Sequence, residues 1–259
     1  MIEAAPPAHA VVAGDGARLP VRVWSPAGPA RRAVVALHGL VTHAGWFAPL
    51  AAALVPRGVA IVAPDRRGNG HARGLAGAGD VARLVDDLAA VVAYARTLAG
   101  DVTLLSWCGS ANFAVPAARA LPIDRLVLAS PGLVPRDELA ARFRDGVPVD
   151  GHLAIHFDPE TDFTDDPDVR TAIRGDALYL RRISVEVRAA WRALNPEARA
   201  ALHSLDIPVR CVLARVDHML DIPRTVALLG DLPISWAAGG HGFVLEPAGA
   251  RQLAEVLAS

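Results

Sequence analysis

Cys108 lies in the stretch of the chain best suited to chemistry, at a point where a strand-like run meets a helix-like run. Residues 102–105 are apolar, as in a buried strand, and residues 111–120 can form a helix. Between them, residues 106–110 read Ser-Trp-Cys-Gly-Ser, a turn of mostly small residues. Such a turn holds its central residue in a strained conformation with positive φ and lifts the side chain clear of the backbone. We therefore predict that Cys108 is a nucleophile; a buried structural cysteine is the alternative.

Asp217 and His241 provide the other two groups that a thiol nucleophile needs. Asp217 follows the apolar run 209–214, and His241 follows the run 234–237. Ligands of open parallel sheets bind at the carboxyl ends of strands, so we expect the three residues to meet there. The imidazole would accept the thiol proton and return it to a leaving group, while the carboxylate would fix its tautomer. Asp221, one turn further on, is a rival acid.

Each of these residues also has a plainer interpretation. Asp217 is equally suited to capping the helix that follows it, and His241 to a simple place in a glycine-rich loop. Their order along the chain, nucleophile then acid then histidine, favours the catalytic interpretation.

Acyl transfer further requires hydrogen-bond donors for a developing oxyanion. The backbone N–H of Gly109, directly after the nucleophile, is the first candidate. The second is expected in the loop after the apolar run 33–37, which ends in His38-Gly39, and we select Leu40. Backbone donors leave no side-chain pattern, so this expectation is geometric.

Composition narrows the possible functions. The net charge is −1, which offers no basic surface for nucleic acid. All 26 basic residues are arginine, so no lysine is present for Schiff-base chemistry, pyridoxal phosphate attachment or a Walker-type phosphate site. We expect no cofactor and no metal. The absence of lysine also fits a GC-rich bacterial genome.

The start of the chain and its cysteines indicate the compartment. The first residues lack the positive and apolar regions of a signal peptide, and no apolar run reaches eighteen residues. The two cysteines do not suggest a disulfide framework. We expect a cytoplasmic protein without membrane contact.

Strand and helix patterns alternate along the whole chain. This alternation predicts an α/β fold with a mostly parallel central sheet and helices on both faces. Residues 133–205 differ, being rich in arginine and aspartate and poor in strand signals. We predict one domain over 1–259, with a core of 1–132 and 206–259 and a helical cap inserted at about 133–205.

The chain resembles the α/β-hydrolase superfamily, in its lysophospholipase or monoacylglycerol-lipase-like branch. The matching stretches are HGLVTHAGWFAPLAAAL, APDRRGNG, LLSWCGS, LVLASPGL, LARVDHMLD and GGHGFVLEP. They keep the family's order over nearly the whole chain. The resemblance implies an α/β-hydrolase fold with Cys108 as nucleophile, Asp217 and His241 as acid and base, and Leu40 and Gly109 as oxyanion donors. It also implies that the insertion covers the pocket.

Cysteine replaces the usual serine at the nucleophile position, and serine replaces both outer glycines of the turn. A cysteine nucleophile is shared with dienelactone hydrolases and some thioesterase-like and synthase-like relatives. We therefore predict an acyl-transfer enzyme acting on an ester or thioester, as hydrolase, thioesterase or acyltransferase, in bacterial specialised metabolism. The alternatives are a lyase that uses His241 and Asp217 as base, and a non-catalytic binding protein.

The expected partner is a small molecule. Arginines of the insertion are mostly expected on a solvated surface. One or two that face inward would suit a carboxylate-bearing substrate or one linked to a carrier or CoA. Trp107, His43 and Tyr179 are candidate substrate contacts, with core packing as the alternative for each. His156 is a further candidate for a polar contact.

Overall fold

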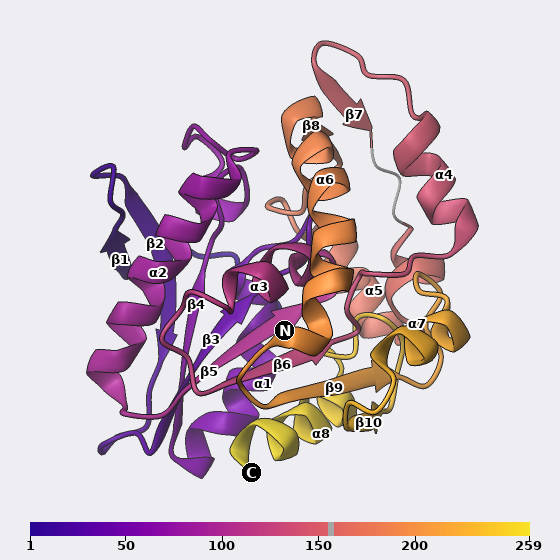
Figure 1. Ribbon diagram of the computed structural model, residues 1–259. Helices are drawn as coiled ribbons and strands as arrows, with labels where there is room; N and C mark the ends of the chain where they lie inside the picture. Colours follow the sequence, from indigo (N-terminus) through magenta and orange to yellow (C-terminus); the bar gives the residue numbers. More distant parts are fainter. Residues whose placement is uncertain (155–157) are drawn as a thin grey trace.

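The computed structural model describes residues 1–154 and 158–259 (Figure 1). Within these residues, eight strands form one sheet in the order β1-β2-β4-β3-β5-β6-β9-β10. The strands are β1 (His9–Val12), β2 (Arg18–Trp24), β3 (Arg32–Leu37), β4 (Val59–Pro64), β5 (Val102–Trp107), β6 (Arg125–Ala129), β9 (Val209–Ala214) and β10 (Ile234–Ala237). From β4 to β10 all neighbours are parallel, and β1 and β2 extend the sheet as antiparallel strands.

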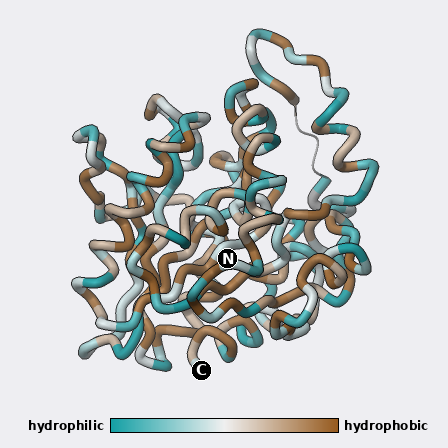
Figure 2. The backbone as a smooth tube through the Cα atoms, in the orientation of Figure 1, coloured by the Kyte–Doolittle hydropathy of each residue, from teal (hydrophilic) through white to brown (hydrophobic). Residues whose placement is uncertain are grey.

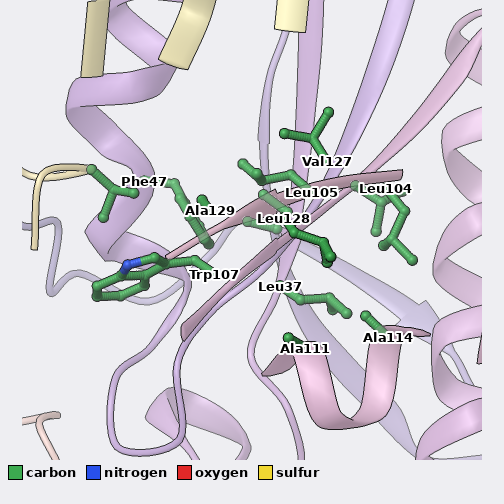
Figure 3. Close-up of a cluster of buried hydrophobic side chains, with 14 of the residues drawn as sticks. Leu37, Phe47, Leu104, Leu105, Trp107, Ala111, Ala114, Val127, Leu128 and Ala129 are labelled. Atoms are coloured by element: carbon green, nitrogen blue, oxygen red, sulfur yellow. The ribbon is translucent and has the colours of Figure 1, made fainter. Parts of the chain in front are cut away.

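The central strands explain why the sheet is parallel. Every residue of β3, β4 and β5 is buried, so these strands have apolar side chains on both faces instead of an alternating pattern. Figure 2 shows the apolar character concentrated along the sheet. Figure 3 shows Leu104, Leu105, Val127 and Leu128 of the central strands within this core.

Helices cover both faces of the sheet, which confirms the predicted fold class. They are α1 (Ala48–Leu54), α2 (Val81–Leu98), α3 (Ala111–Ala117), α7 (Ile222–Leu229) and α8 (Pro247–Ala258). Helix α1 packs beside α8, and α2 contacts α3 (Figure 1). The α2 helix begins where Asp80 accepts a hydrogen bond from the N–H of Arg83, and it buries one face that includes Leu84, Leu88 and Val91.

Residues 133–205, called the insertion below, lie between β6 and β9 along the chain. They are found at the end of the sheet to which the strand arrows point (Figure 1). The insertion contains α4 (Asp137–Asp145), β7 (His152–Ala154), a π-helical turn (Pro159–Phe163), α5 (Pro167–Gly175), β8 (Arg182–Ser184), α6 (Val185–Ala201) and a 3-10 turn (Leu202–Ser204). The antiparallel pairing of β7 with β8 was not expected from the sequence. Strands of three residues are too short to show a periodic pattern.

No helix among the described residues is long and apolar enough to cross a bilayer.

Candidate active site

Cys108 follows β5 directly and begins the short turn that leads into α3. Its φ of 61° is the left-handed conformation that the sequence predicts for the centre of such a turn. Ser106 and Ser110 on either side are fully buried, with their hydroxyl oxygens 2.8 Å apart. The Ser110 hydroxyl also lies 2.8 Å from the carbonyl of Trp107. The two serines, which stand where the resembled family has glycines, therefore hold the turn by hydrogen bonds that do not involve the Cys108 thiol.

His241 faces the thiol from the loop after β10. Its Nδ1 donates a hydrogen bond to Asp217 Oδ2 over 2.8 Å, and both side chains are fully buried. Asp217 Oδ1 accepts two further bonds, each 2.9 Å long, from the N–H groups of Met219 and Leu220. Within the described residues His241 Nε2 has no hydrogen-bond partner, and it is the nitrogen left for Cys108. When the imidazole is neutral, this arrangement keeps its proton on Nδ1 and leaves Nε2 to accept one.

The charges around the His241–Asp217 pair favour proton transfer to the His241 imidazole. Burial disfavours the charged imidazolium form of His241. The charge of Asp217, and to a smaller degree that of Cys108, stabilises this form more than burial disfavours it, so the pKa of His241 lies well above its usual range. Burial likewise opposes the Asp217 carboxylate, and His241 with the two backbone N–H groups nevertheless holds the pKa of Asp217 below its usual value. A buried base with a stabilised cationic form is suited to accept the thiol proton.

Asp221, the rival acid, caps α7 instead. Its side chain accepts a hydrogen bond of 2.9 Å from the N–H of Arg224. The loop that carries His241 is held in place by the insertion, because the carbonyl of Phe163 accepts a 2.6 Å bond from the N–H of Gly242. A Cβ on Gly240 would lie only 2.6 Å from that carbonyl, so the close approach requires glycine there.

The peptide between Gly39 and Leu40 is oriented by two buried side chains. His38 Nε2 accepts a bond from the N–H of Arg66 (3.1 Å), so its Nδ1 carries the proton and donates to the Gly39 carbonyl (2.8 Å). Arg66 Nη2 donates to the same carbonyl (2.7 Å). In a trans peptide the N–H points opposite to the C=O. The Leu40 N–H therefore points away from these donors.

Gly39 and Gly109 bring the two candidate donors beside the thiol. A Cβ on Gly39 would lie 3.5 Å from the Sγ of Cys108, and a Cβ on Gly109 would lie 3.8 Å from the backbone nitrogen of Leu40. The nearest atoms to these two Cβ positions, the Cys108 Cβ and the Trp191 Nε1, would each lie 3.3 Å away, so the segments are packed closely together. The structure thus brings Leu40 and Gly109 together at Cys108, as an oxyanion site requires.

The insertion reaches the turn through α6. Trp191 Nε1 donates to the Gly109 carbonyl (2.9 Å), and the Arg66 guanidinium carbon lies 4.9 Å from the centroid of the Trp191 ring. Asn195, one turn further along α6, donates to Asn112 Oδ1 (2.7 Å), and Asn112 Nδ2 donates to the Gly109 carbonyl (3.1 Å). The carbonyls of both Gly39 and Gly109 are therefore held by a network that includes Trp191.

A cavity of about 290 Å³ opens above Cys108. Its lining includes Cys108, His241, Leu40 and Gly109 together with side chains of α4 and α6. Apolar walls come from Pro135, Leu139, Phe143, Trp191, Met219 and Leu220. The reacting groups therefore share one space that can hold a small ligand.

Trp107, His43 and Tyr179, the expected substrate contacts, do not line this cavity. Trp107 is fully buried (Figure 3), and its Nε1 donates to the His241 carbonyl over 3.1 Å, so we assign it a positioning role instead. His43 is also fully buried, with Nδ1 accepting from the N–H of Gly45 (3.2 Å) and Nε2 donating to Asp176 (2.9 Å). Because both of its ring nitrogens are used, His43 has a structural role instead of the expected substrate contact.

Tyr179 lines a different cavity, of about 1170 Å³, and Leu40 lines both cavities. The phenol is buried against Trp46 and Phe163, and burial is the main reason that the pKa of Tyr179 lies above its usual value. His156 lies outside the described residues. Among those described, no group of three or more His, Cys, Asp or Glu side chains could hold a metal ion.

Arg66 is the functional candidate that the sequence analysis missed. It is buried, and burial lowers its pKa to about 10, while Cys108 and Asp65 act in the opposite direction. Its neighbour Arg67 instead forms an ion pair with Asp87 over 2.7 Å. Two adjacent arginines thus have different roles, and no sequence signal separates them.

Comparison with known proteins identifies relatives of this arrangement. Residues 28–259 match the protein family described as serine aminopeptidase, S33. Among solved structures, the chain is similar to the monoacylglycerol lipase of Paleococcus ferrophilus, with 20% identity and a TM-score of 0.75 over 93% of this chain and 96% of the lipase. It is also similar to a soluble variant of the Saccharomyces cerevisiae monoglyceride lipase, with 13% identity and a TM-score of 0.78 over 99% and 96%.

A third similar structure is the thioesterase domain from the curacin biosynthetic pathway, with 17% identity and a TM-score of 0.64 over 94% of this chain and 96% of that domain. At these identities the likeness shows the fold. No curated protein sequence matches the chain significantly.

Proposed function

The chain belongs to the serine aminopeptidase S33 family of the α/β-hydrolase superfamily, and from that premise we propose that it is an acyl-transfer enzyme with Cys108 as its nucleophile. One observation carries this proposal. His241 is bound to Asp217 through Nδ1 over 2.8 Å, while its Nε2, which has no hydrogen-bond partner among the described residues, belongs to a side chain that shares a cavity with Cys108. A thiol, an imidazole and a carboxylate in this order form a nucleophile, a base and the group that orients the base.

In the proposed reaction, His241 Nε2 takes the proton of the Cys108 thiol as the sulfur forms a bond to the acyl carbon. The electron pair of the carbonyl moves onto its oxygen, and the N–H groups of Leu40 and Gly109 donate to that oxyanion. When the carbonyl re-forms, the alcohol or thiol departs with the proton from His241. Water or another acceptor, deprotonated by the same nitrogen, then releases the acyl group from Cys108.

The substrate is proposed to be a small-molecule ester or thioester. A thioester intermediate on Cys108 reacts readily with amines and carbon nucleophiles as well as with water, so the acceptor decides between hydrolysis and transfer. Linkage of the substrate to a carrier or to CoA fits a role in bacterial specialised metabolism, which the replaced nucleophile and the lysine-free composition favour. We further propose that the insertion acts as a cap, since α4 and α6 provide walls of the cavity.

Intact-protein mass spectrometry with a panel of acyl esters and acyl thioesters tests the proposal. The expected result is an acyl adduct on the wild-type protein and on Cys211→Ala, and no adduct on Cys108→Ala. If Cys108→Ala keeps its turnover while His241→Ala is inactive, a lyase that uses His241 as base replaces the proposal. If neither variant changes the binding of ligands and no turnover occurs, the chain is a binding protein.

A further inference from the structure

Three arginines line the cavity above Cys108. Arg144 comes from α4, and Arg188 and Arg192 come from α6. Among the described residues that line this cavity there is no aspartate or glutamate. Apart from the Cys108 thiol, the ionisable side chains that line the cavity are therefore the three arginines and His241.

The three arginines are not equivalent. Arg144 forms two bonds of 2.8 Å with Asp145, so a carboxylate already balances its charge. Arg188 donates from Nη1 to the backbone carbonyl of Gly146 over 3.0 Å, which fixes the side chain without balancing its charge. Within the described residues, neither Arg188 nor Arg192 forms an ion pair. Residues four apart on a helix lie on the same face, so these two charges are adjacent.

Much of the remaining lining of the cavity is apolar. Leu139 and Phe143 of α4, Trp191 of α6 and Met219 form this part of its wall. A volume of about 290 Å³ is at the lower end of the range for small-molecule sites, about 300–1,000 Å³, so it suits a short acyl chain.

We propose that Arg188 and Arg192 bind an anionic group of the substrate, a carboxylate or a phosphate, while the apolar wall holds the acyl chain and the scissile carbonyl lies at Cys108. This inference rests on the proposed acyl-transfer function and specifies its substrate class. Guanidinium groups donate in a fork that matches the oxygens of carboxylates and phosphates. An anion there gives Arg188 and Arg192 the close ion-pair partner that the described residues do not provide.

The charge of the cavity can be measured without knowing the substrate. Iodoacetate and iodoacetamide alkylate the same thiol and have nearly the same shape, but only iodoacetate is anionic. The quantity to measure is the rate with iodoacetate divided by the rate with iodoacetamide at Cys108, relative to the same quotient for free cysteine. We expect this ratio to fall about fivefold in Arg192→Gln and about tenfold or more in Arg188→Gln/Arg192→Gln. Arg199→Gln is the matched control, because Arg199 is exposed on the same helix and does not line the cavity.

Salt provides an independent check on this ratio. In the wild type the ratio should fall as ionic strength rises, since a Debye length of about 10 Å at 0.1 M screens partly exposed charges. The double variant should lose most of this dependence. His241 and Arg66 remain in every variant, so their contribution cancels in the comparison. An unchanged ratio in the double variant would overturn the proposal.

Two substrate pairs then identify the anion. The p-nitrophenyl monoester of glutaric acid carries a carboxylate that p-nitrophenyl pentanoate lacks, and butyryl-CoA carries phosphates that butyryl-N-acetylcysteamine lacks. The double variant should raise KM for the charged member of one pair about tenfold and leave its neutral member unchanged. Equal KM changes within both pairs contradict the inference. Loss of all activity in Cys108→Ala with no anion preference in the wild type would sink the inference alone, whereas full activity in Cys108→Ala would sink the proposed function.

Discussion

Cys108 directly follows β5 and Cys211 lies in β9, and only β6 separates these two strands in the sheet, yet the surroundings of the two cysteines differ completely. Cys211 is inside β9, paired with Leu128 on one side and Ile234 on the other, and it is fully buried. Burial alone raises its pKa to about 12. Cys108 lies one residue beyond β5, with positive φ, and lines a cavity that also contains His241. The position of a cysteine relative to the strand end thus decides whether it lines a cavity or lies within the core.

The charges around the two thiols also differ. Cys108 acts to raise the pKa of both Arg66 and His241, whereas burial is the single influence on the pKa of Cys211. Cys211 therefore serves as an internal control for every experiment on Cys108.

The largest expected effect comes from replacing one thiol or the other. Cys108→Ala should lower kcat/KM for the best ester or thioester by at least about 10⁴-fold, because the nucleophile is lost. Cys211→Ala should keep kcat/KM near the wild-type value and lower only the free energy of unfolding, by about 1 kcal/mol for the small cavity left in β9. Steady-state kinetics and urea denaturation measure the two quantities. Equal losses of activity in both variants would remove the distinction between the cysteines.

Asp217→Asn should reduce the difference in reactivity between the thiols of Cys108 and Cys211. The variant keeps the shape of the acid but no longer fixes the proton on His241 Nδ1, so kcat should fall about 10³- to 10⁴-fold. Without the carboxylate, the burial of His241 is opposed less, and the pKa of its imidazole should fall from its raised value. NMR titration of the ring protons in wild type and variant checks this direction. Asp221→Asn is the control, since Asp221 caps α7 and should affect stability alone.

Alkylation under native conditions should separate the two thiols by about 10³-fold or more. Iodoacetamide should label Cys108 directly, while Cys211 becomes accessible only when β9 opens. Peptide mapping after timed labelling at neutral pH measures both rates. In denaturant the two rates should become similar, and rapid labelling of Cys211 in the folded protein would contradict its buried position.

Trp191→Phe should have the smallest effect and separate the reactivity of the thiol from stabilisation of the oxyanion. The variant keeps a ring beside Arg66 but loses the hydrogen bond to the Gly109 carbonyl. We expect kcat to fall about tenfold as one constraint on the oxyanion site is lost. The alkylation rate of Cys108 should change less than twofold. A parallel loss of both rates would mean that Trp191 acts on the thiol itself.

Much of this protein could be predicted from local sequence. The apolar run 102–105, the small residues of the turn and the helix-forming residues after it define the setting of Cys108 because each depends on neighbours within a few positions. Alternating strand and helix patterns then imply a parallel sheet, which brings Cys108, Asp217 and His241 to one edge. The structure confirms this fold and brings the three residues together there.

Only the tertiary structure decided the direction of individual side chains. Asp217 and Asp221 are four residues apart, and the choice between them depends on where His241 lies in the folded chain. The bond from Trp191 to Gly109 joins residues 82 positions apart, and the bond from His43 to Asp176 joins residues 133 apart. Periodicity describes which face of an element is buried, but contacts over such separations depend on how the insertion packs against the sheet. For this reason the sequence indicates the reacting groups, whereas the arginines of α6 that face them emerge only from the fold.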